Sequence, residues 1–204
     1  SAKELSKLRK AAGEELRQRI EAGLKELSMP SVRFETELTP LGGEPGFDET
    51  GMDEVRFLMS ANAGETPGRI SKIASGGELA RIMLVMKDVL SERDGVPAMV
   101  FDEIDEGVSG IAAQRVAEKL ARLARKKQVI CVTHLPQIAA MADTHFRIAK
   151  TERDGRTYTQ VTPLDREGRI RELARLHGGE NVTETTLASA AEQLDAASNY
   201  KGGL

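Results

Sequence analysis

Two short apolar runs, at residues 98–102 and 128–133, place the strongest constraint on the fold of this chain. Neither run alternates apolar with polar side chains, and such uninterrupted runs are typical of strands buried on both faces of a parallel sheet. A helical pattern at 109–125 separates the two runs, and a strand, a helix and a strand in this order predict a parallel pair. We therefore expect an α/β fold with a largely parallel sheet flanked by helices.

The first part of the chain is a long amphipathic pattern. Apolar side chains recur every three or four positions from 2 to 27, which predicts a helix that ends at Met29-Pro30. Its apolar stripe is narrow, as in a helix taken from a longer coiled-coil arm. An ordinary surface helix packed on its own domain explains the same pattern.

The remaining segments divide into strands and helices by the period of their apolar residues. We expect strands at 32–38, 55–59, 145–150 and 157–162, and helices at 78–91, 136–142, 166–176 and 182–194. The residues from 195 onward are expected to fray.

Composition and charge narrow the class of protein. The net charge of −3 gives no electrostatic reason to expect nucleic acid as a partner, so any DNA contact is local or belongs to another region of a longer protein. The single cysteine, Cys131, excludes an internal disulfide and is expected to be a small buried hydrophobic side chain in a reducing compartment. No segment has the pattern of a signal peptide or of a membrane span, and we expect a cytoplasmic protein.

Basic side chains cluster at 122–127 and at 166–175. The first cluster complements the dipole at a helix C-terminus, and the second is explained as a solvated helix face. Contact with DNA is the alternative for both, and it predicts that charge reversal reduces the salt dependence of DNA binding.

A glycine-rich run directly precedes one predicted helix, and it consists of Ser75, Gly76, Gly77 and Glu78. Glycines let a phosphate approach the backbone, and the free N–H groups and dipole of the first helical turn favour its negative charge. A capping box, in which Ser75 and Glu78 satisfy the helix terminus reciprocally, explains the same residues without a ligand.

Polar side chains follow both apolar strands. Asp102 and Glu103 end the first strand, and His134 follows the second, so we expect all three at the edge where ligands of open α/β sheets bind. One carboxylate there can hold Mg²⁺ through its waters, the next can activate a water that attacks a γ-phosphate, and the histidine can contact that phosphate. Solvated strand-end charges and a structural histidine are the alternatives.

The order and spacing of these three features resemble the second half of ABC-type ATPases. Within that superfamily, the runs 72–84, 100–110 and 131–143 resemble the RecN family of SMC-like bacterial DNA-repair proteins. The chain departs from the family pattern at Glu106, where Thr is usual, and at Ala80, where Ser is usual. Neither departure touches a residue assigned to chemistry, but Glu106 puts contacts across a dimer in question.

The resemblance implies the C-terminal lobe of an ABC-type ATPase head at 30–198, after the end of a coiled-coil arm helix at 1–29 and before a flexible tail at 199–204. Such heads close as homodimers around two ATP molecules with Mg²⁺, each nucleotide held by the N-terminal lobe of one subunit and capped by the signature run of the other. The implied partners are the N-terminal lobe of the same protein, a second copy and, for the full protein, DNA. The implied location is the nucleoid-associated cytoplasm.

The resemblance also assigns roles to residues. The run 75–78 is the signature that reaches the γ-phosphate in trans. Asp102 supports Mg²⁺, Glu103 acts on the attacking water and His134 senses the γ-phosphate. Asp105, which belongs with the nucleotide-binding residues, lies in the loop that crosses the dimer interface.

No Gly-x-x-x-x-Gly-Lys-Ser/Thr phosphate-binding loop occurs in the sequence, so we expect the chain alone to hydrolyse no ATP. An SMC-type chromosome-organising head shares the split plan and stays an alternative. A transporter ATPase is disfavoured by the leading helix. A nucleotide-gated scaffold with little hydrolysis is the alternative from another class, and the intact pair of acids argues against it.

Overall fold

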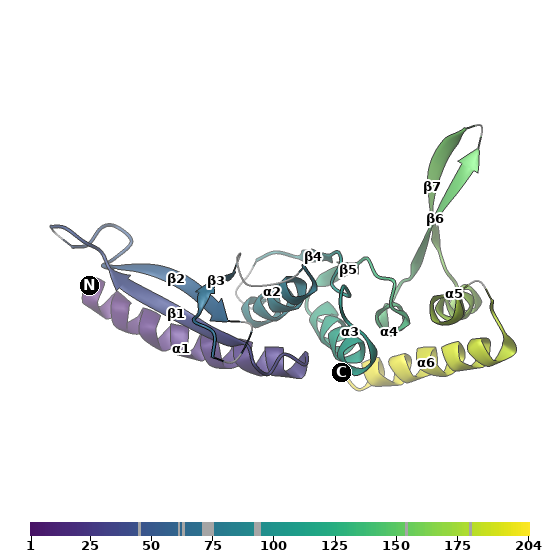
Figure 1. Cartoon of the computed structure of the whole chain (residues 1–204), viewed down its shortest axis with the longest axis horizontal. Helices are drawn as coiled ribbons and strands as arrows, with labels where there is room; N and C mark the ends of the chain where they lie inside the picture. The colour runs from purple at the N-terminus through teal and green to yellow at the C-terminus, as the bar shows by residue number, and fades with distance from the viewer. Residues whose placement is uncertain are drawn as a thin grey trace. The chain divides into compact units, whose positions relative to one another are not determined.

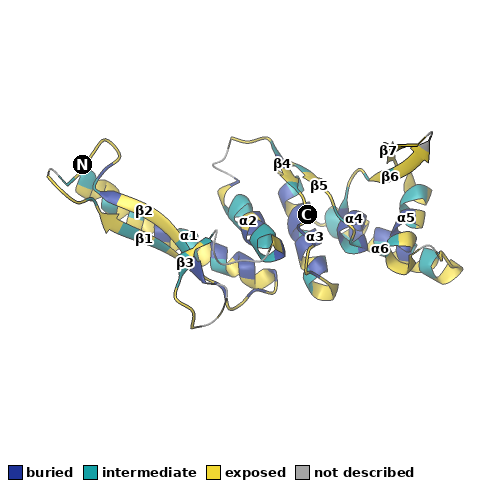
Figure 2. Cartoon of the chain, turned by 45° about the horizontal axis from the view of Figure 1, so that its top comes forward, coloured by how far each residue is buried: buried dark blue, intermediate teal, exposed yellow. Residues whose placement is uncertain are grey.

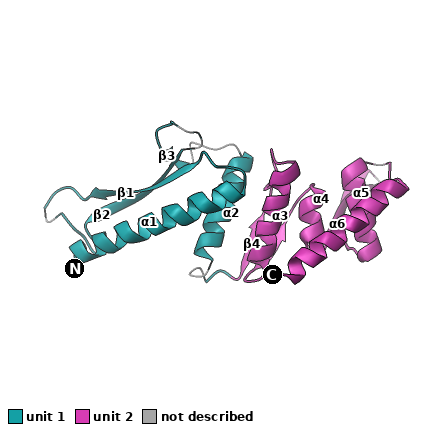
Figure 3. Ribbon diagram, turned by 90° about the horizontal axis from the view of Figure 1, so that it is seen from below, with its two compact units in different colours: residues 1–96 teal, residues 97–204 magenta. Residues whose placement is uncertain are grey.

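A computed structural model describes residues 1–44, 46–60, 62, 64–70, 76–91, 95–153, 155–179 and 181–204. The chain forms two compact units, at 1–96 and 97–204, which Figure 3 shows in two colours. Each unit has its own set of helices and strands and is described by itself.

The first unit is a long helix lying along an antiparallel sheet. In Figure 1, α1 runs beside β1 and β2, and the three strands pair in the order β1-β2-β3. The bounds of its elements are α1 (Ala2–Glu26), β1 (Arg33–Pro40), β2 (Asp53–Ser60), β3 (Gly68–Arg69) and α2 (Gly76–Leu90).

The contact between α1 and β1 is close. Gly13 is buried, and a Cβ added to it would lie 2.9 Å from the Cβ of Thr36 in β1. Further along, fully buried Ile20 and Leu24 of α1 and Phe34 of β1 belong to the core of this unit. These contacts fit the alternative of a surface helix packed on its own domain, and the end of a coiled-coil arm stays a prediction.

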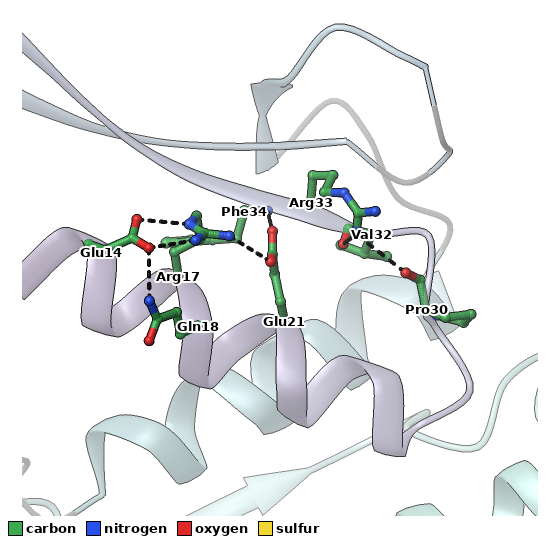
Figure 4. A network of polar contacts seen from close by, with 8 residues as sticks. All are labelled: Glu14, Arg17, Gln18, Glu21, Pro30, Val32, Arg33 and Phe34. Carbon is green, nitrogen blue, oxygen red and sulfur yellow. Dashed lines mark hydrogen bonds and ion pairs between the residues drawn. The ribbon is translucent and has the colours of Figure 1, made fainter.

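A polar network also ties α1 to β1 (Figure 4). Arg17 donates hydrogen bonds to both Glu14 and Glu21, and Glu21 accepts a hydrogen bond of 3.2 Å from the backbone N–H of Phe34. The hydrogen bond from Arg17, helped by one from Gln18, lowers the pKa of Glu14 to about 2. The charged side chains of α1 therefore bind one another and also hold the start of β1 against the helix.

The second unit begins with the two strands that the apolar runs predict. Its elements are β4 (Ala98–Phe101), α3 (Gly110–Ala124), β5 (Gln128–Cys131), α4 (Pro136–Met141), β6 (Phe146–Arg153), β7 (Arg156–Pro163), α5 (Arg166–Gly178) and α6 (Glu184–Gly202). β4 and β5 pair in parallel through the crossover helix α3, as expected. β6 and β7 form an antiparallel two-stranded ribbon that projects away from α5 (Figure 1).

The parallel sheet that the apolar runs predict is present but has only two described strands. Within the described ranges, only β4 and β5 pair in parallel, while the other two sheets are antiparallel. The strands β4 and β5 are also not buried on both faces, since Val100 is 68% and Ile130 is 49% exposed. Among the described residues, α3 packs against β5 while Val100 and Ile130 stay exposed, and Figure 2 draws β5 in the exposed and intermediate colours.

The last helix is longer than predicted. It was expected to end at 194, but α6 continues to Gly202, so most of the predicted tail is helical. Lys201 near its end donates hydrogen bonds to the Asp143 carboxylate at 2.7 Å and to the carbonyl of Ala142 at 3.1 Å. None of the helices described is both long and apolar enough for a membrane span.

Candidate functional site

The carboxyl ends of β4 and β5 bring the predicted acids and histidine to one edge of the parallel pair. Asp102 and Glu103 follow β4, and His134 lies three residues beyond β5. The two strands are still paired at this point, because the N–H of Val132 donates a hydrogen bond of 2.9 Å to the carbonyl of Phe101. All three residues therefore follow the same end of the paired strands, as expected, and each is exposed, while their roles in chemistry stay predictions.

Glu103 has an unusual backbone conformation for a residue with a side chain. Its φ is +57°, in the left-handed region that disfavours residues other than glycine, asparagine and aspartate by roughly 1–2 kcal/mol. The carbonyl of Glu103 accepts a hydrogen bond of 3.1 Å from the N–H of Glu106, which closes the turn after β4. Such strain is concentrated at functional positions, and here it turns the chain sharply directly after Asp102.

Asp105 lies behind this edge, in contact with His134. Its carboxylate Oδ2 accepts hydrogen bonds from the Thr133 hydroxyl at 2.5 Å and from the backbone N–H of His134 at 2.8 Å. Nδ1 of the His134 ring lies 3.0 Å from the same oxygen; the Asp105 side chain is 4% exposed and that of His134 72%. The loop of Asp105 is predicted to cross a dimer interface, and within this chain the Asp105 side chain is turned inward, onto His134.

These contacts set the charge of the cluster. Burial of the Asp105 carboxyl group would raise its pKa, but the hydrogen bonds from Thr133 and from the His134 amide outweigh burial and hold the pKa below its ordinary value. Asp105 is thus an ionised carboxylate at neutral pH. The pKa of the neighbouring Cys131 thiol shifts in the opposite direction, to about 12, because burial and the charges of Asp105 and Asp102 disfavour the thiolate.

Thr133 is a residue of this site that the sequence reasoning did not select. Its hydroxyl donates to Asp105 and accepts a hydrogen bond of 3.0 Å from the N–H of Leu135, which is the N-cap residue of α4. The available signal is a hydroxyl residue directly before the histidine at the end of an apolar strand. A hydroxyl there is both donor and acceptor, which suits a position between a carboxylate and a helix start.

The glycine-rich run belongs to the other compact unit. Ser75 lies outside the described residues, so neither its capping role nor a phosphate contact is tested. Gly76 and Gly77 open α2, with Gly76 exposed and Gly77 buried, and Glu78 is half-buried in the first turn. Burial lowers the pKa of Arg81, one turn further on, and the charge of Glu78 acts in the opposite direction.

The donor set at the β4 edge fits a Mg²⁺ ion held together with phosphate. Across the part of the chain that the structure describes, no group of three or more His, Cys, Asp or Glu side chains forms a metal cage. Asp102 and Glu103 offer exposed carboxylates instead. Mg²⁺ in nucleotide sites is usually bound by one or two carboxylates together with waters and substrate phosphates, which matches this set.

Comparison with solved structures identifies the fold. The chain is similar to a structure solved in work on the ATP-driven dimerization and DNA-stimulated activation of SMC ATPases. The TM-score is 0.51 at 22% identity, and the match covers 86% of this chain and 99% of that one. It is also similar to the Smc head domain with a coiled coil and joint from Pyrococcus yayanosii, with a TM-score of 0.59, 24% identity and coverage of 86% and 31%. The chain shares the fold of these SMC head structures.

Comparison with curated sequences gives the narrower relationship. The chain is 43% identical to the DNA repair protein RecN of Bacillus subtilis over 98% of its length, 44% identical to RecN of Halalkalibacterium halodurans over 97%, and 41% identical to RecN of Vibrio cholerae over 97%. No protein-family model matches the chain. It is a relative of the RecN DNA repair proteins and corresponds to their C-terminal part, spanning only 35–37% of the length of these three.

Proposed function

We propose that this chain is the C-terminal part of a RecN-like ATPase that dimerises around ATP and hydrolyses it in the repair of DNA double-strand breaks. The observation that carries the proposal is the shared edge of β4 and β5, where Asp102, Glu103 and His134 are exposed together. Three side chains of these types, on adjacent parallel strand ends, suit the binding and hydrolysis of a nucleotide triphosphate.

Each residue has a distinct task in this proposal. Asp102 would hold Mg²⁺ through its waters, and the ion would neutralise charge on the phosphates. Glu103, placed on the strained turn, orients the attacking water and accepts its proton. His134 contacts the γ-phosphate or that water. The glycine-rich run at the start of α2 caps the nucleotide held by a second copy, with its first-turn N–H groups directed at phosphate.

The proposed enzyme needs a further part that supplies the phosphate-binding loop. Two exposed apolar surfaces of the second unit support the presence of such a part. The exposed face of the β4–β5 pair carries Val100, Ile130 and Val132, and parallel sheets are normally covered on both faces. The ribbon of β6 and β7 exposes Phe146 and Val161 on one face, and an isolated two-stranded hairpin is marginally stable in water.

We infer that the remaining two-thirds of a RecN-like protein covers these apolar surfaces and completes the nucleotide site. The partners of the assembled protein would then be its own N-terminal lobe, a second copy and DNA. Since the net charge of this chain is −3, the DNA contacts are assigned to local basic surfaces or to the other lobe.

The test is to co-express the chain with the N-terminal part of a RecN protein and to measure the mass of the complex with and without ATP. Glu103→Gln preserves the shape of the side chain but not its basicity, so this variant is expected to accumulate as an ATP-bound dimer of heads. Glu167→Gln, an exposed acid of α5, should behave like the parent protein. Failure of Glu103→Gln to accumulate as a dimer would contradict the role given to Glu103.

A further inference from the structure

The turn after β4 and the segment after β5 are held together by one buried carboxylate. Oδ2 of Asp105 is approached by three groups, the Thr133 hydroxyl at 2.5 Å, the His134 amide at 2.8 Å and the His134 ring Nδ1 at 3.0 Å. Two of the three come from the histidine that the proposed function places at the phosphate. The carboxylate therefore acts on the orientation of that ring.

The surroundings of Asp105 leave it little freedom. Its neighbour Ile104 is fully buried, and Val108 is nearly so. The N–H of Val108 donates to the carbonyl of Asp105 at 3.2 Å, which closes a second turn after the one begun by Glu103. On the other side, Thr133 is fixed by the N–H of Leu135. The oxygen that meets the histidine is thus anchored from both strands.

The chemistry of the contact determines which ring nitrogen carries the proton. An ionised carboxylate attracts an N–H group and repels a nitrogen lone pair, so a Nδ1 atom 3.0 Å from it is favoured in the protonated form. In the neutral ring, Nε2 is then left as an acceptor, and it becomes a donor only when the ring is protonated. With the side chain 72% exposed, Nε2 is the nitrogen available to a reactant.

We propose that Asp105 and Thr133 are positioning residues that hold the His134 ring as the Nδ1–H tautomer and present Nε2 to the reaction. The importance of this for catalysis rests on the proposed function. It gives the neutral histidine a definite task, because an Nε2 lone pair accepts a hydrogen bond from water, whereas contact with a phosphate oxygen needs the imidazolium form. This positioning role acts within one subunit, whereas the resemblance implies that the loop of Asp105 crosses the dimer interface.

The tautomer can be measured on this chain without nucleotide. The chain has three histidines, and two-bond ¹H–¹⁵N correlation spectra at about pH 8, above the ordinary pKa of histidine, distinguish the two neutral tautomers. His134 is expected as Nδ1–H. His177 is an internal reference for the other form, because its Nε2 lies 2.7 Å from the acceptor oxygen of Gln193. An Nε2–H spectrum for His134 would overturn the proposal.

Variants test the two positioning residues separately. Asp105→Ala is expected to shift His134 toward Nε2–H, while Asp143→Ala, an exposed acid of the same unit, leaves it unchanged. Thr133→Ser should keep the Nδ1–H form, and Thr133→Val should raise the share of Nε2–H. If Asp105→Ala does not fold, the parent and Thr133 spectra still decide the matter. A tautomer unchanged in folded Asp105→Ala or in Thr133→Val would overturn the role of that residue.

Kinetics of the reconstituted ATPase supply a second readout. Asp105→Asn is expected to lower kcat on the order of 10- to 100-fold, as loss of an outer-shell partner typically does, and to add little once His134→Ala is present. Effects that multiply in the double variant would mean that Asp105 acts independently of His134. A parent complex without any turnover would count against the proposed function, and the tautomer would still decide the positioning roles.

Discussion

Arg175 donates two hydrogen bonds, of 2.6 and 3.0 Å, to the carboxylate of Glu172, which lies one turn earlier on α5. The Glu172 side chain is only 10% exposed. Arg147 of β6 approaches the same carboxylate at 3.5 Å, so the pair also ties the β6–β7 ribbon to the helix. The hydrogen bond from Arg175 outweighs burial and lowers the pKa of Glu172. Glu172→Gln should reduce the free energy of unfolding by roughly 1–3 kcal/mol, because it weakens the partner of two cations.

Urea unfolding of matched variants checks this expectation. Glu167 of the same helix pairs with Arg171 at 3.2 Å, but the two side chains are 82% and 68% exposed. Glu167→Gln should therefore change the free energy of unfolding by no more than about 0.5 kcal/mol. Equal effects of the two substitutions would contradict a structural role for the Glu172 cluster.

The close approach of α1 to β1 predicts an unfavourable alanine. Replacing a glycine inside a helix by alanine normally gains up to about 1 kcal/mol. At Gly13, however, the new methyl group would meet the Cβ of Thr36 at 2.9 Å, so Gly13→Ala should lower stability by roughly 1–3 kcal/mol. Gly202→Ala, where no atom lies within 4 Å of the added carbon, should be neutral or slightly stabilising in the same thermal or urea melts. A stabilising Gly13→Ala would mean that the helix does not pack on the sheet in this way.

The depressed pKa of Asp105 predicts a pH-dependent contribution to stability. The folded pKa lies below the ordinary 3.8, so the stabilisation is fully present above that value and is lost as the pH falls through the folded pKa. Asp105→Asn should cost roughly 1–3 kcal/mol at pH 7, and the difference from the parent protein should narrow below about pH 4. Asp143→Asn, which alters an exposed ion pair with Lys201, should cost less than about 1 kcal/mol at both pH values. A difference that widens on acidification would contradict the assigned charge of Asp105.

The raised pKa of Cys131 predicts an unreactive thiol. A rise from 9.0 to about 12 lowers the thiolate fraction, which greater nucleophilicity offsets only in part. Native protein at pH 8 should react with a disulfide reagent on the order of 50-fold more slowly than urea-unfolded protein at the same pH. Asp105→Asn should speed the native reaction by removing one of the charges that raise the pKa. Equal rates for native and unfolded protein would contradict the half-buried environment of Cys131 beside two carboxylates.

The sequence predicts the local elements well because their signals are local. The apolar runs and the helix between them predict the parallel pair, and the polar residues that follow each strand predict the edge at which they lie, without reference to anything distant. The same runs led to an error about burial. Val100 and Ile130 are apolar, as residues of a covered strand usually are, but both are exposed in the part of the chain that the structure describes. Periodicity records that a face is apolar and not which segment covers it.

Other features depend on contacts that a linear pattern does not contain. Asp105 is recognisable as an acid near the strand end, but its inward direction follows from Thr133 and His134, about thirty positions later. The end of α6 was placed too early because its stripe continues through Ala197, a weakly apolar residue that is nevertheless buried with Leu194. Alanine carries little hydrophobic signal, although it packs as well as a larger side chain where helices lie close.

The most direct test of the account is ATP turnover by the chain alone and after reconstitution with the N-terminal part of a RecN protein, measured as phosphate release under identical conditions. The account predicts no turnover by residues 1–204 alone, turnover by the reconstituted pair, and its loss in Glu103→Gln but not in Glu167→Gln. Hydrolysis by the isolated chain, or hydrolysis by the pair that survives Glu103→Gln, would contradict it.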